Sequence, residues 1–315
     1  MMQCYSKKQF TNRRGDSRMF DLDLHQLKVF HSVARYLSYS KAGEALALSQ
    51  PAVSRQVANL ERSLGLELFT RRGRQVMLTD AGRSLYDFAD RIYNLTEQAR
   101  RAMAQFKDLE RGETLLGAST TIGSYILPAL LQSFRERYPN IEISLEIGNS
   151  AAIEKLILTG AIDLGFIGMP AQDPKLHVEP YLADELVLAV PPDHPLKDKK
   201  EISPADFAGE TLIWREKGSA TRAATEEYLS ARQIKTAGVM EIGNNEAIKG
   251  LVAAGTGVAF ISQYALTLEV KANLLQIAGG DKTKITRHFY LVFAKDRHLF
   301  PTALAFINFT RKMAF

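Results

Sequence analysis

The sequence predicts an α+α/β chain, in which a small helical module is followed by a long helix and then by an α/β module. Three observations carry this prediction: helical spacing of apolar residues up to residue 64, an unbroken helical pattern from about residue 80 to 110, and alternating strand and helix patterns from residue 114. The length of 315 residues is enough for two or three domains, each with its own core. With 46% hydrophobic and 24% charged residues, the composition excludes a disordered chain.

The net charge of +5 is unevenly distributed along the chain. Residues 1–112 carry 19 Lys and Arg against 12 Asp and Glu, whereas residues 113–315 carry 21 against 23. This division favours a nucleic-acid-binding module attached to a part that need not touch nucleic acid. No apolar run is long enough to span a membrane, the single cysteine (Cys4) fits a reducing compartment, and the basic start lacks a signal-peptide core. We therefore expect a cytoplasmic protein with no membrane partner.

The first predicted helix covers Leu24–Tyr36, where apolar residues recur every three or four positions. Ser40 is then expected to cap a short second helix, in which Ala42 and Ala45 are small enough to let another helix cross closely. Residues 1–18, which precede the first helix, are expected to be a disordered extension. Translation from a start codon upstream of Met19 is the simpler explanation of this segment.

A third helix begins after a turn, with Ser49 as its cap, Pro51 in its first turn and Gly65 at its end. Two helices joined by a short turn fit a helix-turn-helix, whose later helix enters the major groove of DNA. The face opposite its apolar side has no acidic residue and carries groups that reach base edges or phosphates, namely Gln50, Ser54, Arg55 and Asn59. An ordinary polar surface is the alternative, but such a surface usually includes Glu or Asp.

A β-hairpin is predicted next, from residue 66 to 79, with a basic tip made by Arg71, Arg72 and Arg74. Such a wing lies beside a recognition helix and adds salt-dependent affinity for the DNA backbone.

The run SQPAVSRQVANLERSLGLELFTR (Ser49–Arg71), followed by LTDAG (Leu78–Gly82), resembles the winged helix-turn-helix of LysR-type transcriptional regulators. The agreement is in register over nearly sixty residues. The resemblance implies sequence-specific binding of double-stranded DNA. It places the residues matching Ser49, Gln50, Pro51, Ser54 and Arg55 at the major groove, and those matching Arg72 and Arg74 in the wing.

A long helix is predicted from a cap at Thr79 or Asp80 to about Glu110. Its apolar residues alternate at spacings of three and four, which is typical of a coiled-coil seam: Leu85, Phe88, Ile92, Leu95, Ala99, Ala102, Phe106 and Leu109. The alternative is a helix packed against its own domain. A seam predicts a homodimer on a roughly palindromic operator, and the resemblance implies pairing of two dimers into a tetramer.

The remaining residues predict nine strands alternating with helices, from a strand near Leu115–Ala118 to one near Phe289–Phe293, with a helix at Ser124–Tyr138 among them. The resemblance implies a two-lobed α/β effector domain of the type II periplasmic-binding-protein fold. Lobe I would comprise about residues 113–185 and 289–315, and lobe II about 186–288. The predicted domains are thus a DNA-binding domain (19–78), a linker helix (79–112) and an effector-binding domain (113–315).

Hydroxyl and amide side chains follow three of these strands, where helices begin. Because ligands of open α/β sheets lie at strand ends beside helix N-termini, these residues predict a site for a small anion such as a carboxylate, sulfate or phosphate ester. The resemblance supports this site, since the matching residues of the family border the inducer cleft. The predicted site residues are Ser119, Thr120, Thr121, Asn149, Ser219, Thr221 and Arg222. Simple helix capping is the alternative role of each.

Enzymatic chemistry has little support, because the six histidines show no metal-binding spacing and no nucleophile or phosphate-loop motif is present. We predict no metal and no cofactor. Asp163 and Glu154 are expected to be surface or capping carboxylates. The predicted function is an effector-controlled regulator that recruits RNA polymerase. The segments ASTTIGSYILP and EIGNSAAI of the chain are similar to those of regulators of sulfur assimilation or carbon fixation. A solute-binding or transferase-like protein with the same two lobes is the alternative, although it would not need residues 24–110.

Overall fold

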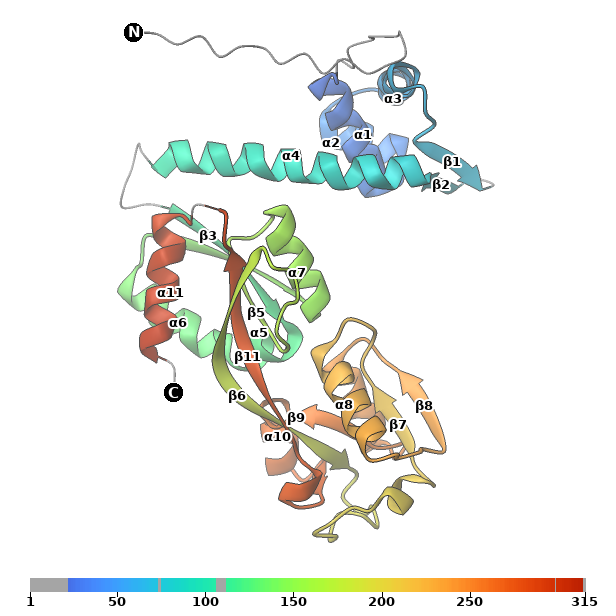
Figure 1. Cartoon of the computed structure of the whole chain (residues 1–315), viewed down its shortest axis with the longest axis vertical. Coiled ribbons are helices and arrows are strands. Elements are labelled where there is room, and N and C mark those ends of the chain that lie inside the picture. The colour runs from blue at the N-terminus through green and yellow to red at the C-terminus, as the bar shows by residue number, and fades with distance from the viewer. Residues whose placement is uncertain (1–21, 73–74, 106–111, 298, 314–315) are drawn as a thin grey trace. The chain divides into compact units, whose positions relative to one another are not determined.

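The computed structural model describes residues 22–72, 75–105, 112–297 and 299–313 (Figure 1). The predicted extension at residues 1–18 lies outside this description. The chain divides into two compact units, of which the first ends at Tyr93 and the second begins at Asn94. The division falls inside one helix, α4 (Asp80–Gln105), whereas the sequence suggested a linker separate from both domains.

The first unit is a winged helix-turn-helix, as predicted. Its elements are α1 (Leu24–Tyr36), α2 (Tyr39–Leu46), α3 (Gln50–Leu64), β1 (Phe69–Arg72), β2 (Gln75–Leu78) and the first half of α4. Ser49 caps α3 as expected, its Oγ accepting the Ala52 amide. The cap of α2 was predicted wrongly: Ser38, which is extended, accepts the Lys41 amide, and Ser40 is already helical.

The close approach of α2 to the following turn depends on Gly43 and not on Ala45, which is exposed. A Cβ atom at Gly43 would lie 2.6 Å from the carbonyl oxygen of Leu48. The wing is positioned by Glu61 of α3, whose Oε1 accepts the amides of Leu68 (2.8 Å) and Phe69 (3.2 Å). The recognition helix and the wing are therefore held together by one carboxylate.

The second unit contains the nine predicted strands within its described residues. In chain order its elements are β3 (Gly112–Ser119), α5 (Thr120–Tyr125), α6 (Leu127–Arg137), β4 (Ile141–Gly148), α7 (Ser150–Thr159), β5 (Leu164–Ile167), β6 (Leu176–Val190), β7 (Thr211–Trp214), α8 (Ala220–Ala231), β8 (Gly238–Glu241), α9 (Asn245–Ala253), β9 (Ala259–Ser262), α10 (Thr267–Lys271), β10 (Gln276–Ala278), β11 (Ile285–Ala294) and α11 (Pro301–Met313), with short 3₁₀ helices at Pro204–Phe207, Gln263–Ala265 and Asp281–Thr283. The helix predicted at Ser124–Tyr138 is two helices with a break at Ile126, just before Pro128.

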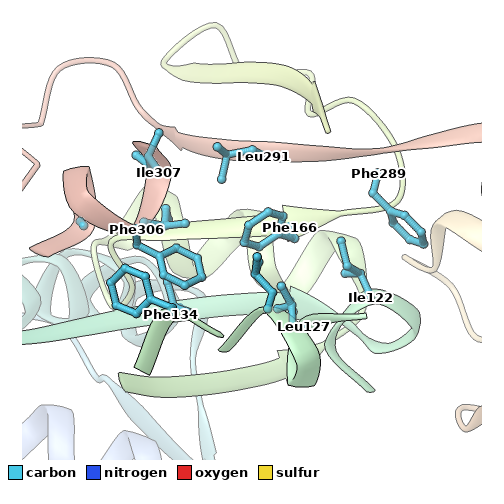
Figure 2. Close-up of a cluster of buried hydrophobic side chains, with 13 residues drawn as sticks. Ile122, Leu127, Phe134, Phe166, Phe289, Leu291, Phe306 and Ile307 are labelled. Carbon is cyan, nitrogen blue, oxygen red and sulfur yellow. The ribbon is translucent and has the colours of Figure 1, made fainter. Parts of the chain in front are cut away.

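Lobe I is a sheet in the order β6-β11-β5-β3-β4, with helices on both faces. Helices α5, α6 and α11 cover one face, where Phe134, Phe166 and Phe306 form the centre of a buried cluster (Figure 2). Helix α7 covers the other face through Ile153 and Ile157. Strand residues alternate between these two clusters, with Leu164 and Phe166 in one and Ile167 in the other, which explains why the β5 sequence LGFI is continuously apolar.

Lobe II is built on the ends of the same two long strands, β6 and β11, which pass from one lobe to the other (Figure 1). The sequence predicted only residues 186–190 of β6, because Pro180 and the neighbouring acidic residues hide the earlier part of the strand. Pairing with β11 accommodates this segment, with an irregularity between Phe289 and Tyr290 opposite Pro180. Within the described residues, no helix is long and apolar enough to cross a membrane.

Candidate functional site

A small cavity lies between the two lobes, where the first strand of lobe I and helices from both lobes meet. The centre of a water-sized sphere can occupy about 10 Å³ of it, so the cavity has room for about one water molecule. Six of the seven predicted anion-site residues line it, and four further residues complete the lining. This interlobe cavity is lined by Ser119, Thr120, Thr121, Asn149, Ser150, Arg215, Ser219, Ala220, Thr221 and Arg287.

Arg287 of β11 supplies one positive charge at the interlobe cavity. Its Nε donates to Asp184 Oδ2 (2.7 Å) and its Nη1 to Thr221 Oγ1 (3.1 Å), while Asp184 also accepts from Ser262 Oγ (2.6 Å). Burial lowers the pKa of Arg287, the charge and hydrogen bond of Asp184 oppose this shift, and the nearby charge of Arg215 adds to it. Because Arg287 and Arg215 line the same small cavity, one ligand there could contact both guanidinium groups.

Arg215, directly after β7, supplies the second charge and is almost fully buried. Its Nη1 donates to Asn245 Oδ1 (2.6 Å) and its Nη2 to Thr120 Oγ1 (3.3 Å). The guanidinium also holds Glu216, with Nε to Oε2 at 2.8 Å and Nη2 to Oε1 at 3.0 Å. Because Thr120 belongs to lobe I and the other partners to lobe II, Arg215 links the two lobes.

Ser119 provides an unused polar group at the same place. It is 7% exposed, and its Oγ has no hydrogen-bond partner among the described residues. Ser119 precedes α5, but its side chain makes no capping hydrogen bond, so helix capping is not its role. Asn149, in contrast, does cap a helix, since its Oδ1 accepts the Ala152 amide. A buried hydroxyl without a partner beside two guanidinium groups suits an anionic oxygen.

Arg222, also predicted for this site, lies outside the interlobe cavity. Its guanidinium pairs with Glu226 and Glu241 and covers the ring of Trp214, with the centre of the ring 4.6 Å away. The cavity is lined instead by Arg215 and Arg287, neither of which the sequence prediction included. The signal available was a basic residue within or directly after a strand that is otherwise largely apolar.

Tyr125 of lobe I and Glu246 of lobe II form a further contact between the lobes. The Tyr125 hydroxyl donates to Glu246 Oε1 (2.5 Å), and Lys249 holds the same carboxylate at 2.9 Å. Burial and this hydrogen bond raise the pKa of Tyr125 to about 12. With Arg215–Thr120 and Asn149–Glu216, this contact holds the lobes closed around the cavity. Among the described residues, no group of three His, Cys, Asp or Glu could hold a metal ion.

The outward face of α3 presents the residues predicted to contact DNA. Ser49, Gln50, Pro51, Ser54 and Arg55 are exposed, and Asn59 is half-buried. Asn59 Oδ1 accepts from Arg62 Nη1 (3.1 Å), so Arg62, which the prediction omitted, extends the same polar face. In the wing, Arg71 and Arg72 are the last residues of β1, their side chains are not described, and Arg74 lies outside the described residues.

Comparison with known proteins agrees with this architecture. Residues 24–83 match the family model described as "Bacterial regulatory helix-turn-helix protein, lysR family", and residues 107–314 match "LysR substrate binding domain". The chain belongs to the LysR family. This LysR-type regulator is 36% identical over 291 residues to the "HTH-type transcriptional activator CmpR" of Synechocystis sp., covering 92% of this chain and 95% of the relative.

A second relative is the "RuBisCO operon transcriptional regulator" of Allochromatium vinosum, 35% identical over 288 residues, with 91% of this chain and 95% of the relative covered. Among solved structures, the regulatory domain of Synechocystis PCC6803 CcmR in complex with 2-PG has a TM-score of 0.61 and 31% identity, covering 65% of this chain and 98% of that one. The protein is thus a LysR-type DNA-binding transcriptional regulator with an effector-binding domain, and its relatives match the carbon-fixation subgroup.

The linker helix of this LysR-type regulator shows two kinds of apolar residue. Leu85 and Ile92, predicted to face a partner chain, instead pack into the core of their own unit beside Phe30 and Leu60. Three others on α4 are exposed: Phe88 (59%), Leu95 (65%) and, outside the predicted seam, Met103 (59%). Ala99 is exposed as well, the side chain of Ala102 is not described, and Phe106 and Leu109 lie outside the described residues.

Asp163 is not the surface carboxylate that the sequence suggested, because it is buried with Arg101 of α4. Arg101 Nη1 and Nη2 donate to its two oxygens at 3.1 and 3.0 Å, and the Leu115 amide donates to Oδ2 at 2.9 Å. Gln98 of α4 donates to the Gly160 carbonyl at 2.7 Å nearby. Through these contacts the second half of the linker helix is part of the effector unit.

Proposed function

We propose that this LysR-type regulator responds to a small oxyanion, of the class of phosphorylated or simple carboxylates, bound in the interlobe cavity. The observation that carries the proposal is the buried Ser119 hydroxyl, which has no partner among the described residues and lies in a cavity with Arg215 and Arg287. Thr120, Thr121 and Thr221 would add hydroxyls, and Asn149 its amide. Arg222 is not part of the proposal.

The size of the cavity indicates how the ligand would enter. Room for about one water cannot hold a ligand of several heavy atoms, so the lobes would part for entry and close again on the ligand. The 2-PG bound by the CcmR regulatory domain, 2-phosphoglycolate, has one phosphate and one carboxylate. Two guanidinium groups and a set of hydroxyls would suit these two charged ends.

Calorimetric titration of the full chain with 2-phosphoglycolate tests this proposal. Ser119→Ala is expected to weaken binding at least tenfold, because a hydrogen bond to a charged group contributes about 1.5–3 kcal/mol. Ser230→Ala, at an exposed position of α8, is the matched control and should bind like the parent. If both variants bind 2-phosphoglycolate as tightly as the parent, the ligand does not bind in this cavity.

The exposed face of α3 supports binding to the two halves of a dyad operator by a homodimer. We expect Ser49, Gln50, Pro51, Ser54, Arg55 and Asn59 to lie at the major groove, and Arg71, Arg72 and Arg74 to lie along the backbone beside it. Effector binding would change the angle between paired dimers in a tetramer, and with it DNA bending and recruitment of RNA polymerase. The relatives are regulators, and the proposal includes no catalytic step and a cytoplasmic location with the DNA.

Arg55→Ala should reduce the preference for the operator over scrambled DNA by about 1–3 kcal/mol, because an arginine that reads a guanine contributes that much discrimination. The measurement is a fluorescence-anisotropy titration of both DNAs at one salt concentration. An equal loss on the two DNAs would reassign Arg55 to a phosphate contact.

A further inference from the structure

Glu216 places a carboxylate beside the position proposed for the effector. Its Oε2 and Oε1 accept from Arg215 Nε and Nη2 at 2.8 and 3.0 Å, and Oε1 also accepts from Asn149 Nδ2 at 3.2 Å. Arg215 and Asn149 both line the interlobe cavity. The carboxylate of Glu216 thus already occupies two groups that an entering oxyanion would use.

Counting the donors of Arg215 shows how little of it is free. A guanidinium has five N–H groups, arranged so that Nε and one Nη form a fork that matches a carboxylate or phosphate. That fork is filled by Glu216, while Thr120 and Asn245 accept from two of the remaining hydrogens. Only one N–H of Arg215 lacks a partner in the contacts of the described residues. An anion can gain a bidentate contact with Nε and Nη2 of Arg215 only by replacing Glu216.

Glu216 is also able to leave. Its side chain is 25% exposed, whereas that of Arg215 is 4% exposed, so rotation would return the carboxylate to solvent and leave the guanidinium buried. Burial alone would raise the pKa of Glu216, but hydrogen bonds from Arg215 and from its own backbone amide lower it below the usual range. The carboxylate is therefore ionised at neutral pH. Releasing it uncovers a buried positive charge, which is costly unless another anion takes its place.

We propose that Glu216 acts as a built-in counter-ion that competes with the effector for Arg215 and thereby selects ligands of higher charge. This inference rests on the proposed function of the interlobe cavity. A monoanion that replaces Glu216 exchanges one negative charge for another, with little electrostatic gain. A phosphate monoester brings an additional charge to the two guanidinium groups. Because Glu216 of lobe II also accepts from Asn149 of lobe I, its release removes one of the contacts that hold the lobes together.

The test compares three anions, glycolate, inorganic phosphate and 2-phosphoglycolate, on the full-length parent chain and on Glu216→Gln. The variant keeps the size of the side chain and removes its charge. We expect at least a tenfold gain in affinity for glycolate, a smaller gain for 2-phosphoglycolate, and so a reduced preference for the phosphorylated ligand. Glu226→Gln is the matched control, since Glu226 pairs with Arg222 outside the interlobe cavity, and it should bind like the parent.

A double-mutant cycle with Arg215→Met separates competition for Arg215 from a general effect of charge. If Glu216 competes for that guanidinium, the gain from Glu216→Gln disappears when Arg215 is absent. A gain of equal size in both backgrounds would overturn the inference, and so would unchanged affinities in the single variant while the parent binds 2-phosphoglycolate. If neither the parent nor Glu216→Gln binds any of the three anions, the proposed function itself fails.

Discussion

Replacing Asp163 with alanine is expected to destabilise the effector unit by about 3–5 kcal/mol, because it leaves the Arg101 guanidinium buried without its counter-ion. The side chains of Arg101 and Asp163 are 6% and 5% exposed. The change also removes the acceptor of the Leu115 amide at the centre of the lobe I sheet.

Urea unfolding followed by the fluorescence of Trp214 measures this loss directly, since Trp214 is the only tryptophan of the chain and lies in the effector unit. Arg100→Met is the matched control: Arg100, next to Arg101, forms an exposed pair with Glu97 and should contribute at most about 1 kcal/mol. Arg101→Met combined with Asp163→Leu should recover much of the stability, because two apolar side chains would replace the buried pair. A loss below about 1 kcal/mol in Asp163→Ala would contradict this account.

Leu95→Glu in the linker helix is expected to dissociate the homodimer. The exposed residues Phe88, Leu95 and Met103 form the apolar stripe of α4 that the proposed dimer would bury. Burial of a leucine is worth about 2–5 kcal/mol, and two-fold symmetry places every substitution at the interface twice. A charge at this position should therefore raise the dimer dissociation constant by several orders of magnitude.

Analytical ultracentrifugation of the full chain gives the oligomeric state. Arg100→Glu, at an exposed position on a different side of the same helix, tests whether a new negative charge on α4 is enough to separate the chains. It should leave the dimer intact. A Leu95→Glu protein that sediments like the parent, at concentrations near the parent's dissociation constant, would exclude the stripe as the interface.

The local elements of the fold could be predicted closely, because caps and apolar spacing are properties of neighbouring residues. Leu24–Tyr36 and Thr211–Trp214 have the predicted bounds, and Ser49 and Gly65 end α3 as expected. The first part of β6 was missed, because its extended conformation depends on pairing with β11, which lies about a hundred residues later in the chain.

Roles that depend on distant partners were harder to predict. Helix α4 has the heptad spacing of a dimer seam, but Leu85 and Ile92 of that spacing pack against their own unit. The burial of Arg101 could not be predicted, because nothing near it in sequence indicates Asp163. Similarly, the hydroxyl-rich turns indicated where the interlobe cavity lies. They could not indicate that Arg222 lies outside it, because this depends on the contacts of Arg222 with Glu226 and Glu241.

Arg287 of β11 and Asp184 of β6 are directly opposite each other in the antiparallel ladder, within the two segments that cross between the lobes. When two lobes open about a hinge, atoms near the hinge axis move least and atoms far from it move most. Arg287 would therefore keep almost the same place whether the lobes are apart or together, while Tyr125 of lobe I and Glu246 of lobe II separate. We expect an arriving ligand to dock first on this stationary charge and to recruit the moving groups afterwards.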